Sequence, residues 1–218
     1  TKEMIKQSEV ETITLLVRRR HEDPEIAGSA KVIQKIVDVF EPNTYREYLA
    51  GNDLAFSTFG VGEPSKISRE EFVKVDFDAV SALAKECKGS GVRHFSSLGS
   101  VGANVKSGIF YLKLKGKLEQ VLIGLKFDRV SLFRPSMIIT PKNRYGFSQA
   151  MTLMFYPSLD PMLIGGLKQY RSVKVEDLGR AMALNAIRPP RGAVEVMTRK
   201  EFDLILSGST AQGRLKTD

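Results

Sequence analysis

The sequence predicts an α/β fold in which a mostly parallel β-sheet is covered by helices on both faces, the doubly wound arrangement. Two observations support this prediction. Apolar runs typical of strands alternate with helix signals along the 218 residues, and such alternation places successive strands side by side in parallel. The strand segments are almost continuously apolar, as expected for strands buried on both faces. Because no linker or internal repeat divides the chain, we expect a single domain over residues 1–218.

The N-terminal part of the chain predicts strands separated by short helical segments. The expected elements are the end of a helix at 2–10, strands at 12–17 and 31–40, a short helix at 44–51 and a strand at 53–59. Each strand is a run of β-branched and apolar residues. The short helix has a capping box at Thr44 and Glu47 and a stop at Gly51.

The remainder of the chain begins with a long helix, which a capping box at Ser68 and Glu71 opens and Gly89 ends. We then expect a buried strand at 92–98, a helix at 111–125, a strand at 129–135 whose apolar run continues to 139, a helix at 176–187, a strand at 193–197 and a closing helix from 198. The segment 142–170 has no clear periodicity. We interpret it as a lid or a flap that faces a partner.

Composition limits the function classes. The net charge is +8, but apart from the clusters at 18–20 and 113–117 the basic residues are dispersed, and no nucleic-acid-binding motif accompanies them. A pocket for a phosphorylated small molecule explains both clusters as economically. The two histidines and single cysteine form no metal-ligand spacing, and Cys87 falls on the apolar face of a predicted helix as a core thiol. No apolar run is long enough to span a bilayer.

The segment 92–115 is the part of the sequence best suited to chemistry. Its buried strand ends in a Ser/Gly turn that contains Ser97 and Ser100, and Tyr111 and Lys115 open the next helix four positions apart. That spacing places both side chains on one helix face, where an ammonium group favours the phenolate form of a tyrosine. This layout moves a proton to or from a carbonyl or alcohol oxygen. A second pair with the same spacing, Tyr170 and Lys174, lies in a segment that reads as extended, and we interpret it as a coincidence.

Other candidate residues follow the carboxyl ends of the predicted strands, where ligands of such sheets bind. They are Arg18, Arg19, Asp38, Phe59, Gly60, Arg134 and Ser136. The two arginines suit a ribose 2′-phosphate, or else form a solvated turn. Asp38 either contacts an adenine amine or only ends its strand, and Arg134 either edges a substrate pocket or forms a turn. For Asp76, we favour an exposed helix residue over a polar residue behind the site.

The chain resembles the atypical short-chain dehydrogenase/reductases of the Tat-interacting-protein type, which have a related fungal mitochondrial branch. The similarity lies in residues 15–19 (LLVRR), 72–76 (FVKVD), 94–100 (HFSSLGS), 111–119 (YLKLKGKLE), 126–129 (KFDR) and 133–135 (FRP). It implies a Rossmann-like fold that binds a nicotinamide dinucleotide, usually NADP. It also implies that Tyr111 donates a proton, that Lys115 binds the nicotinamide ribose and that Ser100, or less favourably Ser97, assists. Gly99 stands where the family usually has Ser.

The resemblance also implies an element that this sequence does not contain. A strand and a Gly-rich turn normally open the fold and hold the cofactor pyrophosphate, yet no G-x-x-G-x-x-G precedes Thr12. We therefore expect a chain that is incomplete relative to its family and holds NADP weakly. The strands at 12–17 and 53–59 would lack the neighbour between them. They would then pair with each other, stay apart, or recruit a strand from another chain to form a homo-oligomer.

Two function classes follow. The first is an NADPH-dependent oxidoreductase that acts on an unidentified carbonyl or alcohol. The alternative is a non-catalytic, reductase-like adaptor that binds protein partners. The lone cysteine indicates a reducing compartment, so we expect a cytoplasmic location, with the mitochondrial surface and the nucleus as alternatives.

Overall fold

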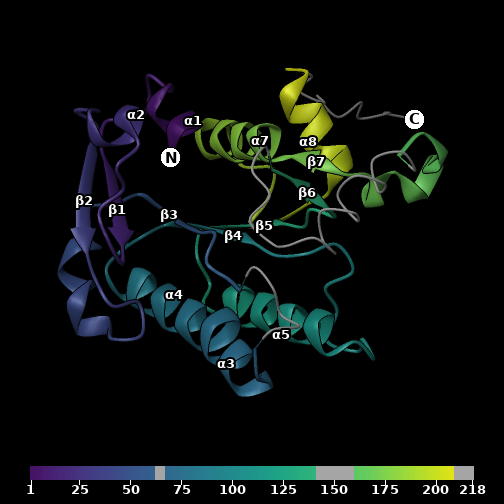
Figure 1. Ribbon diagram of the computed structural model, residues 1–218, viewed down its shortest axis with the longest axis horizontal. Helices are drawn as coiled ribbons and strands as arrows, with labels where there is room; N and C mark the ends of the chain where they lie inside the picture. Colours follow the sequence, from purple (N-terminus) through teal and green to yellow (C-terminus); the bar gives the residue numbers. More distant parts are fainter. Residues whose placement is uncertain (62–66, 141–159, 209–218) are drawn as a thin grey trace, which may run out of the picture.

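The structure is a computed structural model that describes residues 1–61, 67–140 and 160–208. Its centre is a four-stranded parallel sheet in the order β3 (Leu54–Ser57), β4 (His94–Leu98), β5 (Arg129–Phe133) and β8 (Val194–Met197). On one face lie α3 (Arg69–Val73), α4 (Val80–Gly89) and α5 (Phe110–Gly124), and on the other α7 (Val175–Ile187) and α8 (Arg199–Leu206) (Figure 1). The doubly wound α/β prediction is confirmed.

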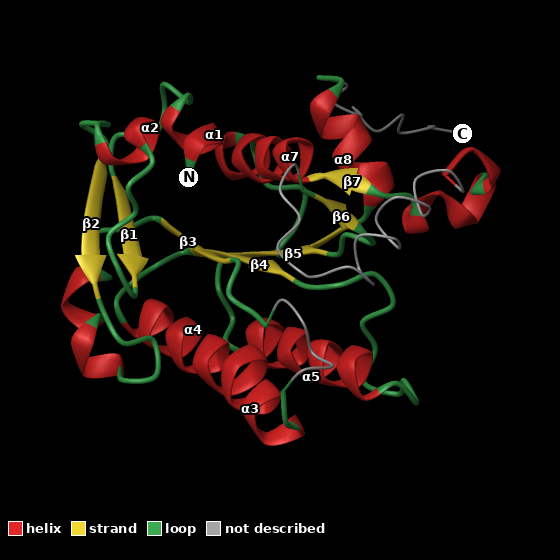
Figure 2. Cartoon of the chain, viewed as in Figure 1, coloured by secondary structure: helices red, strands yellow, loops and turns green. Residues whose placement is uncertain are grey.

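The first two strands form a separate sheet. β1 (Ile13–Val17) pairs in parallel with β2 (Val32–Ile36), and within the described residues neither strand joins the four-stranded sheet. Figure 2 shows this pair beside the β3 end of the central sheet, with its strands steeply inclined to those of that sheet. Of the arrangements expected for the strands at 12–17 and 53–59, pairing with each other does not occur among the described residues.

Two of the three predicted capping boxes are present in the structure. Ser68 and Thr198 form complete capping boxes with Glu71 and Glu201, and α3 and α8 begin where the sequence predicts. Thr44 does not cap a helix: its hydroxyl bonds the carbonyl oxygens of Asp38 and Glu41 at 2.8 and 2.7 Å. The predicted helix at 44–51 is consequently wrong. Two short 3₁₀ turns, η1 (Pro42–Thr44) and η2 (Arg46–Tyr48), take its place.

Short elements complete the described chain. The helix expected at 2–10 is reduced to α1 (Lys2–Ile5). A further short helix that was not predicted, α2 (Pro24–Ala27), is capped by Asp23, which accepts a hydrogen bond from the backbone N–H of Glu25. The long helix that starts at α3 passes through a π-helical turn, η4 (Lys74–Ala79), before α4. The two-stranded sheet of β6 (Ile138–Ile139) and β7 (Val173–Lys174) and the 3₁₀ helix η6 (Gly165–Tyr170) lie near the C-terminal helices. Most of the predicted lid at 142–170 lies outside the described residues.

Each face of the central sheet has its own apolar core. Phe95 and Leu132 point towards α4 and α5, where Leu122 and Cys87 are fully buried. Burial raises the pKa of the Cys87 thiol to about 12, which agrees with the predicted core thiol. Among the described helices, none has the length and apolarity needed to cross a membrane. The two cores hold the central sheet rigid, so the strand ends form a fixed rim for the candidate site.

Candidate active site

Tyr111 and Lys115 lie on the first turns of α5, which begins at Phe110. The ammonium nitrogen of Lys115 is 6.0 Å from the centroid of the Tyr111 ring. That ring packs against Phe72 of α3, with 5.7 Å between ring centroids. The two side chains therefore share one helix face, as their spacing predicts. By contrast, Tyr170 ends η6 and Lys174 lies in β7, so the second pair does not share a helix.

Lys115 is buried and forms an ion pair with Asp76. The distance from Lys115 Nζ to Asp76 Oδ1 is 2.7 Å, and the two side chains are only 6% and 2% exposed. The interpretation of Asp76 as an exposed helix residue is therefore wrong. Its spacing of four from the apolar Phe72 was a signal for the inner face. The π-helical turn that contains Asp76 was not predicted from the sequence.

Asp76 also holds the turn that follows β3. Its second carboxylate oxygen accepts a hydrogen bond of 2.7 Å from the backbone N–H of Val61. A Cβ atom on Gly60 would lie 3.0 Å from Asp76 Oδ1, so the close approach favours glycine at this position. Phe59 precedes this turn and packs edge-on against Phe40 at 6.4 Å. The structure thus brings Gly60, which the sequence analysis predicted at the site, next to the acidic partner of Lys115.

Among the described residues, neither predicted serine is hydrogen-bonded to Tyr111. Ser97 is buried within β4, and the hydroxyl of Ser100 donates to the carbonyl oxygen of Val101 at 3.3 Å. No hydrogen bond joins either serine to Tyr111 in the part of the chain that the structure describes. The turn at Gly99 is fixed by a 2.7 Å hydrogen bond from its N–H to the carbonyl oxygen of Phe133. The assignment of a helper serine stays a prediction.

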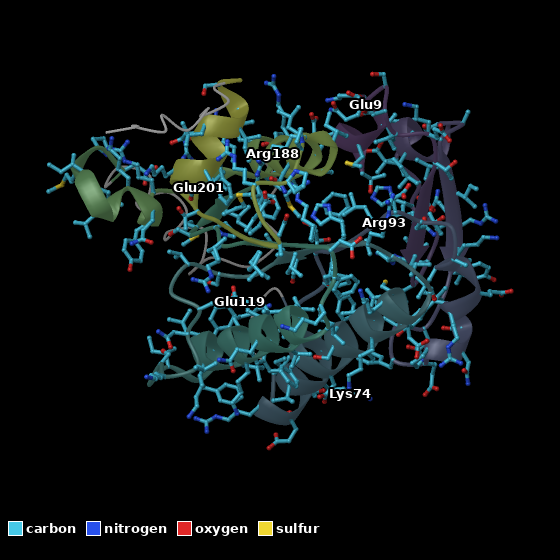
Figure 3. The ribbon with its side chains drawn as sticks, turned by 180° about the vertical axis from the view of Figure 1, so that it is seen from behind. Glu9, Lys74, Arg93, Glu119, Arg188 and Glu201 are labelled. Carbon is cyan, nitrogen blue, oxygen red and sulfur yellow. The ribbon has the colours of Figure 1, made fainter. Side chains whose placement is uncertain are left out.

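Gly99 is adapted to a buried carboxylate below the turn. A Cβ atom at this position would lie 3.3 Å from Glu119 Oε1. Glu119 follows Lys115 by one helical turn and lies on the side of α5 that faces the sheet (Figure 3). At Gly99 a side chain would require Glu119 to shift by a few tenths of an ångström.

Arg134 is the partner of Glu119. Its guanidinium group binds both carboxylate oxygens, with 2.8 Å from Nε to Oε1 and a second contact from Nη2 to Oε2. This bidentate pair connects the end of β5 to the helix that carries Tyr111 and Lys115. Arg134 was predicted to edge the ligand pocket. It follows β5 directly, but its guanidinium group is directed to Glu119, and the pocket assignment stays a prediction.

The loop after the serine turn packs closely against α5 at Gly116. A Cβ atom on Gly116 would lie 2.5 Å from the backbone carbonyl carbon of Asn104 and the backbone nitrogen of Val105. The N–H of Asn104 also donates to the carbonyl oxygen of Leu112 at 3.1 Å. Gly116 lies in the segment 111–119 that carries the family resemblance, but its packing role was not predicted: it sets the distance between the serine loop and the helix of Tyr111 and Lys115.

Three further predicted residues, Arg18, Arg19 and Asp38, lie on the smaller sheet. Arg18 and Arg19 are exposed directly after β1, and Asp38 is exposed after β2. Asp38 accepts a 2.9 Å hydrogen bond from the backbone N–H of Phe40. Among the described residues, no hydrogen bond or ion pair connects these three to Lys115. They lie at strand carboxyl ends, as predicted, but on the sheet that stands apart.

A second polar cluster occupies the opposite side of the sheet. His94 Nε2 lies 2.9 Å from the hydroxyl of Ser131, which donates to Glu195 at 3.0 Å. Arg129 binds Glu195 at 2.8 Å. Burial, assisted by the positive charge of Arg129, lowers the pKa of His94 to about 4. His94 belongs to the segment predicted to carry chemistry, but its side chain is directed to this buried network.

A hollow of about 300 Å³ adjoins Tyr111 on the outer surface. Apolar and aromatic side chains dominate its lining, which consists of Ile67, Ser68, Arg69, Phe72, Ile109, Phe110 and Tyr111. Within the described residues, no group of histidine, cysteine and carboxylate side chains could hold a metal ion. A phenol and an ammonium group are suited to proton transfer and charge stabilisation, the chemistry that was predicted for Tyr111 and Lys115.

Comparisons with known proteins identify relatives along nearly the whole chain. No family model matches. Protein HTATIP2 of Rattus norvegicus is 32% identical over 199 residues, which cover 91% of this chain and 80% of the rat protein. The mitochondrial protein FMP52 of Meyerozyma guilliermondii is 30% identical over 215 residues, which cover 93% of this chain and 90% of that protein.

Solved structures are similar in fold at much lower identity. The structure of MoeE5 in complex with UDP-glucuronic acid and NAD has a TM-score of 0.63 and 16% identity, and the match covers 91% of this chain and 74% of that chain. WbmG of Bordetella bronchiseptica in complex with NAD has a TM-score of 0.61 and 14% identity over 96% of this chain and 74% of that chain. At this identity the likeness shows the fold alone.

Proposed function

Because the chain belongs to the family of HTATIP2 and the FMP52 proteins, the atypical short-chain dehydrogenase/reductases of the Tat-interacting-protein type, we propose that it is an NADPH-dependent oxidoreductase. Its substrate would be a carbonyl compound or the corresponding alcohol. The observation that carries the proposal is the buried ion pair of Lys115 and Asp76 at 2.7 Å beside Tyr111. Burying a lysine is costly unless it is paired. Its placement next to a phenol supports a role in proton transfer.

Each residue has a definite part in this proposal. When bound, the cofactor supplies a hydride to the carbonyl carbon. Tyr111 donates the proton that the carbonyl oxygen takes up, and Lys115 stabilises the phenolate that remains. Ser100 or Ser97 would hydrogen-bond the same oxygen. Glu119 and Arg134 fix α5 against the end of β5, so that Tyr111 stays in place.

The residues present fit the two ends of a nicotinamide dinucleotide. At the end of β3 the backbone of Gly60 packs against Asp76, where a Cβ atom would lie 3.0 Å from Oδ1, and the same carboxylate holds the ammonium group of Lys115. The exposed guanidinium groups of Arg18 and Arg19 suit the 2′-phosphate of NADP. In the described ranges, no glycine-rich turn leads into a helix beside Lys115 to hold the pyrophosphate. Because the two arginines suit the 2′-phosphate, we propose NADP as the cofactor. Because the described residues contain no such turn, we propose that residues 1–218 bind it weakly.

A specific observation also favours the alternative function, an adaptor that binds protein partners. Met162, Ile164 and Leu167 are 74%, 67% and 53% exposed, and all lie in the segment 160–170. Exposed apolar clusters often mark interaction sites. The mitochondrial designation of the FMP52 relatives supports a mitochondrial location over the cytoplasmic one.

The two functions are distinguished by following NADPH absorbance with a panel of aldehydes and ketones. The reductase proposal predicts substrate-dependent oxidation of NADPH by the parent chain and a large loss in the Tyr111→Phe variant. If no member of the panel is reduced, while a Met162→Ser/Leu167→Ser variant loses a partner that the parent binds, the adaptor function is supported instead.

A further inference from the structure

We propose that Asp76 positions the ammonium group of Lys115 and couples it to the turn at Gly60 and Val61. The inference deepens the proposed function and rests on it, because it assigns Asp76 a role in the same reductase site. Asp76 is a positioning residue in this account. It acts on the reaction through Lys115, and it does not touch the reacting atoms.

The contacts of Asp76 are divided between two segments. Oδ1 binds Lys115 Nζ at 2.7 Å, and Oδ2 accepts the N–H of Val61 at 2.7 Å. Each carboxylate oxygen is thus committed to a different neighbour. A displacement of the turn at Val61 rotates or shifts the carboxylate, and the ammonium group must follow it. Gly60 tightens this connection, because its backbone approaches Oδ1 so closely.

The pair orients Lys115 without using up its donors. A lysine ammonium has three N–H groups, and Asp76 takes one. The remaining donors are available for the phenol of Tyr111, whose ring centroid is 6.0 Å away, and for a ligand hydroxyl. Glu119, one helical turn after Lys115, is paired with Arg134, and the guanidinium group of Arg69 lies over the ring of Phe110. Asp76 is the charged group that binds Lys115 in the described structure.

The local helix geometry supports a special role for this position. Asp76 lies in the π-helical turn η4, between the regular helices α3 and α4. A π-helical turn carries one more residue per hydrogen-bonded loop than an α-helical turn, and such turns are frequent at functional sites. The turn places Asp76 inside, at 2% exposure, whereas Asp78 two residues later is exposed. Asp78 therefore serves as a matched control.

The coupling is tested first without any cofactor. The backbone N–H of Val61 should be protected from hydrogen exchange by Asp76. Asp76→Asn weakens this acceptor, and Lys115→Met removes the anchor that holds it, so both should speed exchange at Val61 by about tenfold or more. Asp78→Asn should leave the rate unchanged. An exchange rate at Val61 that is the same in Lys115→Met as in the parent overturns the coupling.

The positioning role is tested by measuring kcat and KM separately. In Asp76→Asn, kcat should decrease by up to about 100-fold, because the ammonium group is no longer held in place, whereas KM for the carbonyl substrate should stay near the parent value. Asp78→Asn should keep the parent kcat and KM. A parent-like kcat in Asp76→Asn contradicts the positioning role.

The outcomes separate this inference from the proposed function. If Asp76→Asn does not fold, Asp76→Glu keeps the charge but lengthens the arm. It should then fold, with reduced kcat and faster exchange at Val61. If Val61 responds as predicted but the parent reduces no carbonyl compound with NADPH, the proposed function fails and the role in catalysis fails with it. If the parent is active and neither Asp76 variant changes kcat, only this inference is overturned.

Discussion

Asp76 and Lys115 form an ion pair of 2.7 Å that is almost inaccessible to solvent. The pair connects the helix after β3 to the helix after β4, and through Val61 it also reaches the turn that ends β3. Buried ion pairs add little net stability, because desolvation offsets the attraction. Their presence is better explained by a functional need for a charge held in one place. This makes the pair the centre of the proposed site.

Tyr111→Phe should reduce turnover by about 10²–10⁴-fold, because it removes the general acid. The ring contact with Phe72 is kept, so the fold should not change. Steady-state rates with the parent's best substrate check this. Tyr170→Phe is the matched control, since that residue does not share a helix with its lysine, and it should stay within twofold of the parent, a change of about 0.4 kcal/mol. Undiminished turnover in Tyr111→Phe would remove Tyr111 from the mechanism.

Arg18→Ala should weaken NADPH binding by about tenfold, the loss of one charge-assisted hydrogen bond to the 2′-phosphate. NADH lacks that phosphate, so its affinity should hardly change. Competitive titrations with both cofactors measure the difference, and Arg20→Ala, one residue beyond the predicted pair, is the control. Equal losses for both cofactors would show that Arg18 does not recognise the phosphate.

Gly116→Ala should destabilise the protein by about 1–3 kcal/mol, since the new methyl group overpacks against a backbone that cannot easily retreat. The Cβ atom would meet Asn104 and Val105 at 2.5 Å. Gly124→Ala in the same helix is the control, because nothing lies within 4 Å of its Cβ position, and it should be neutral or stabilising. Urea unfolding of both variants checks the prediction. If Gly116→Ala is as stable as Gly124→Ala, the loop at 103–107 moves to accommodate the new methyl group without cost.

Stability should decrease as the pH falls from about 6.5 towards 4. The pKa of His94 is lowered from 6.5 to about 4 in the folded chain, so the unfolded chain binds the extra proton first. The contribution of neutral His94 to the free energy of unfolding is complete above pH 6.5 and is lost progressively down to pH 4. The loss has an upper limit of about 3 kcal/mol. Urea midpoints across this range measure it. His94→Gln should flatten the profile, and an unchanged slope in that variant would assign the effect to other groups.

Local signals explain most of what could be predicted from the sequence. The strands and the capping boxes at Ser68 and Thr198 depend on residues within a few positions, and both were found where expected. Thr44 has the same local pattern. The predicted helix cap is absent because the Thr44 hydroxyl binds the carbonyl oxygens of Asp38 and Glu41 instead. Such local bonds from side chain to backbone compete with helix formation.

The part of the candidate site that could be predicted also depends on local signals. The spacing of Tyr111 and Lys115 is a property of one helix and needs no tertiary information. The partner of Lys115 is 39 positions earlier in the chain (115 − 76), and its inward orientation depends on a π-helical turn. Gly116 and Gly99 likewise owe their identity to approaches by Asn104 and Glu119. Such contacts arise only when strands and helices are assembled.

The central claim, that Lys115 belongs to a nicotinamide dinucleotide site, is tested most directly by calorimetric titration of NADPH into the parent chain and into Lys115→Gln, with circular dichroism to confirm that both are folded. We predict saturable binding to the parent with a Kd weaker than about 100 μM, which corresponds to less than about 5.5 kcal/mol, and no saturation with Lys115→Gln. Titrations that coincide for the two proteins, or an absence of binding to the parent at millimolar NADPH, would contradict the claim.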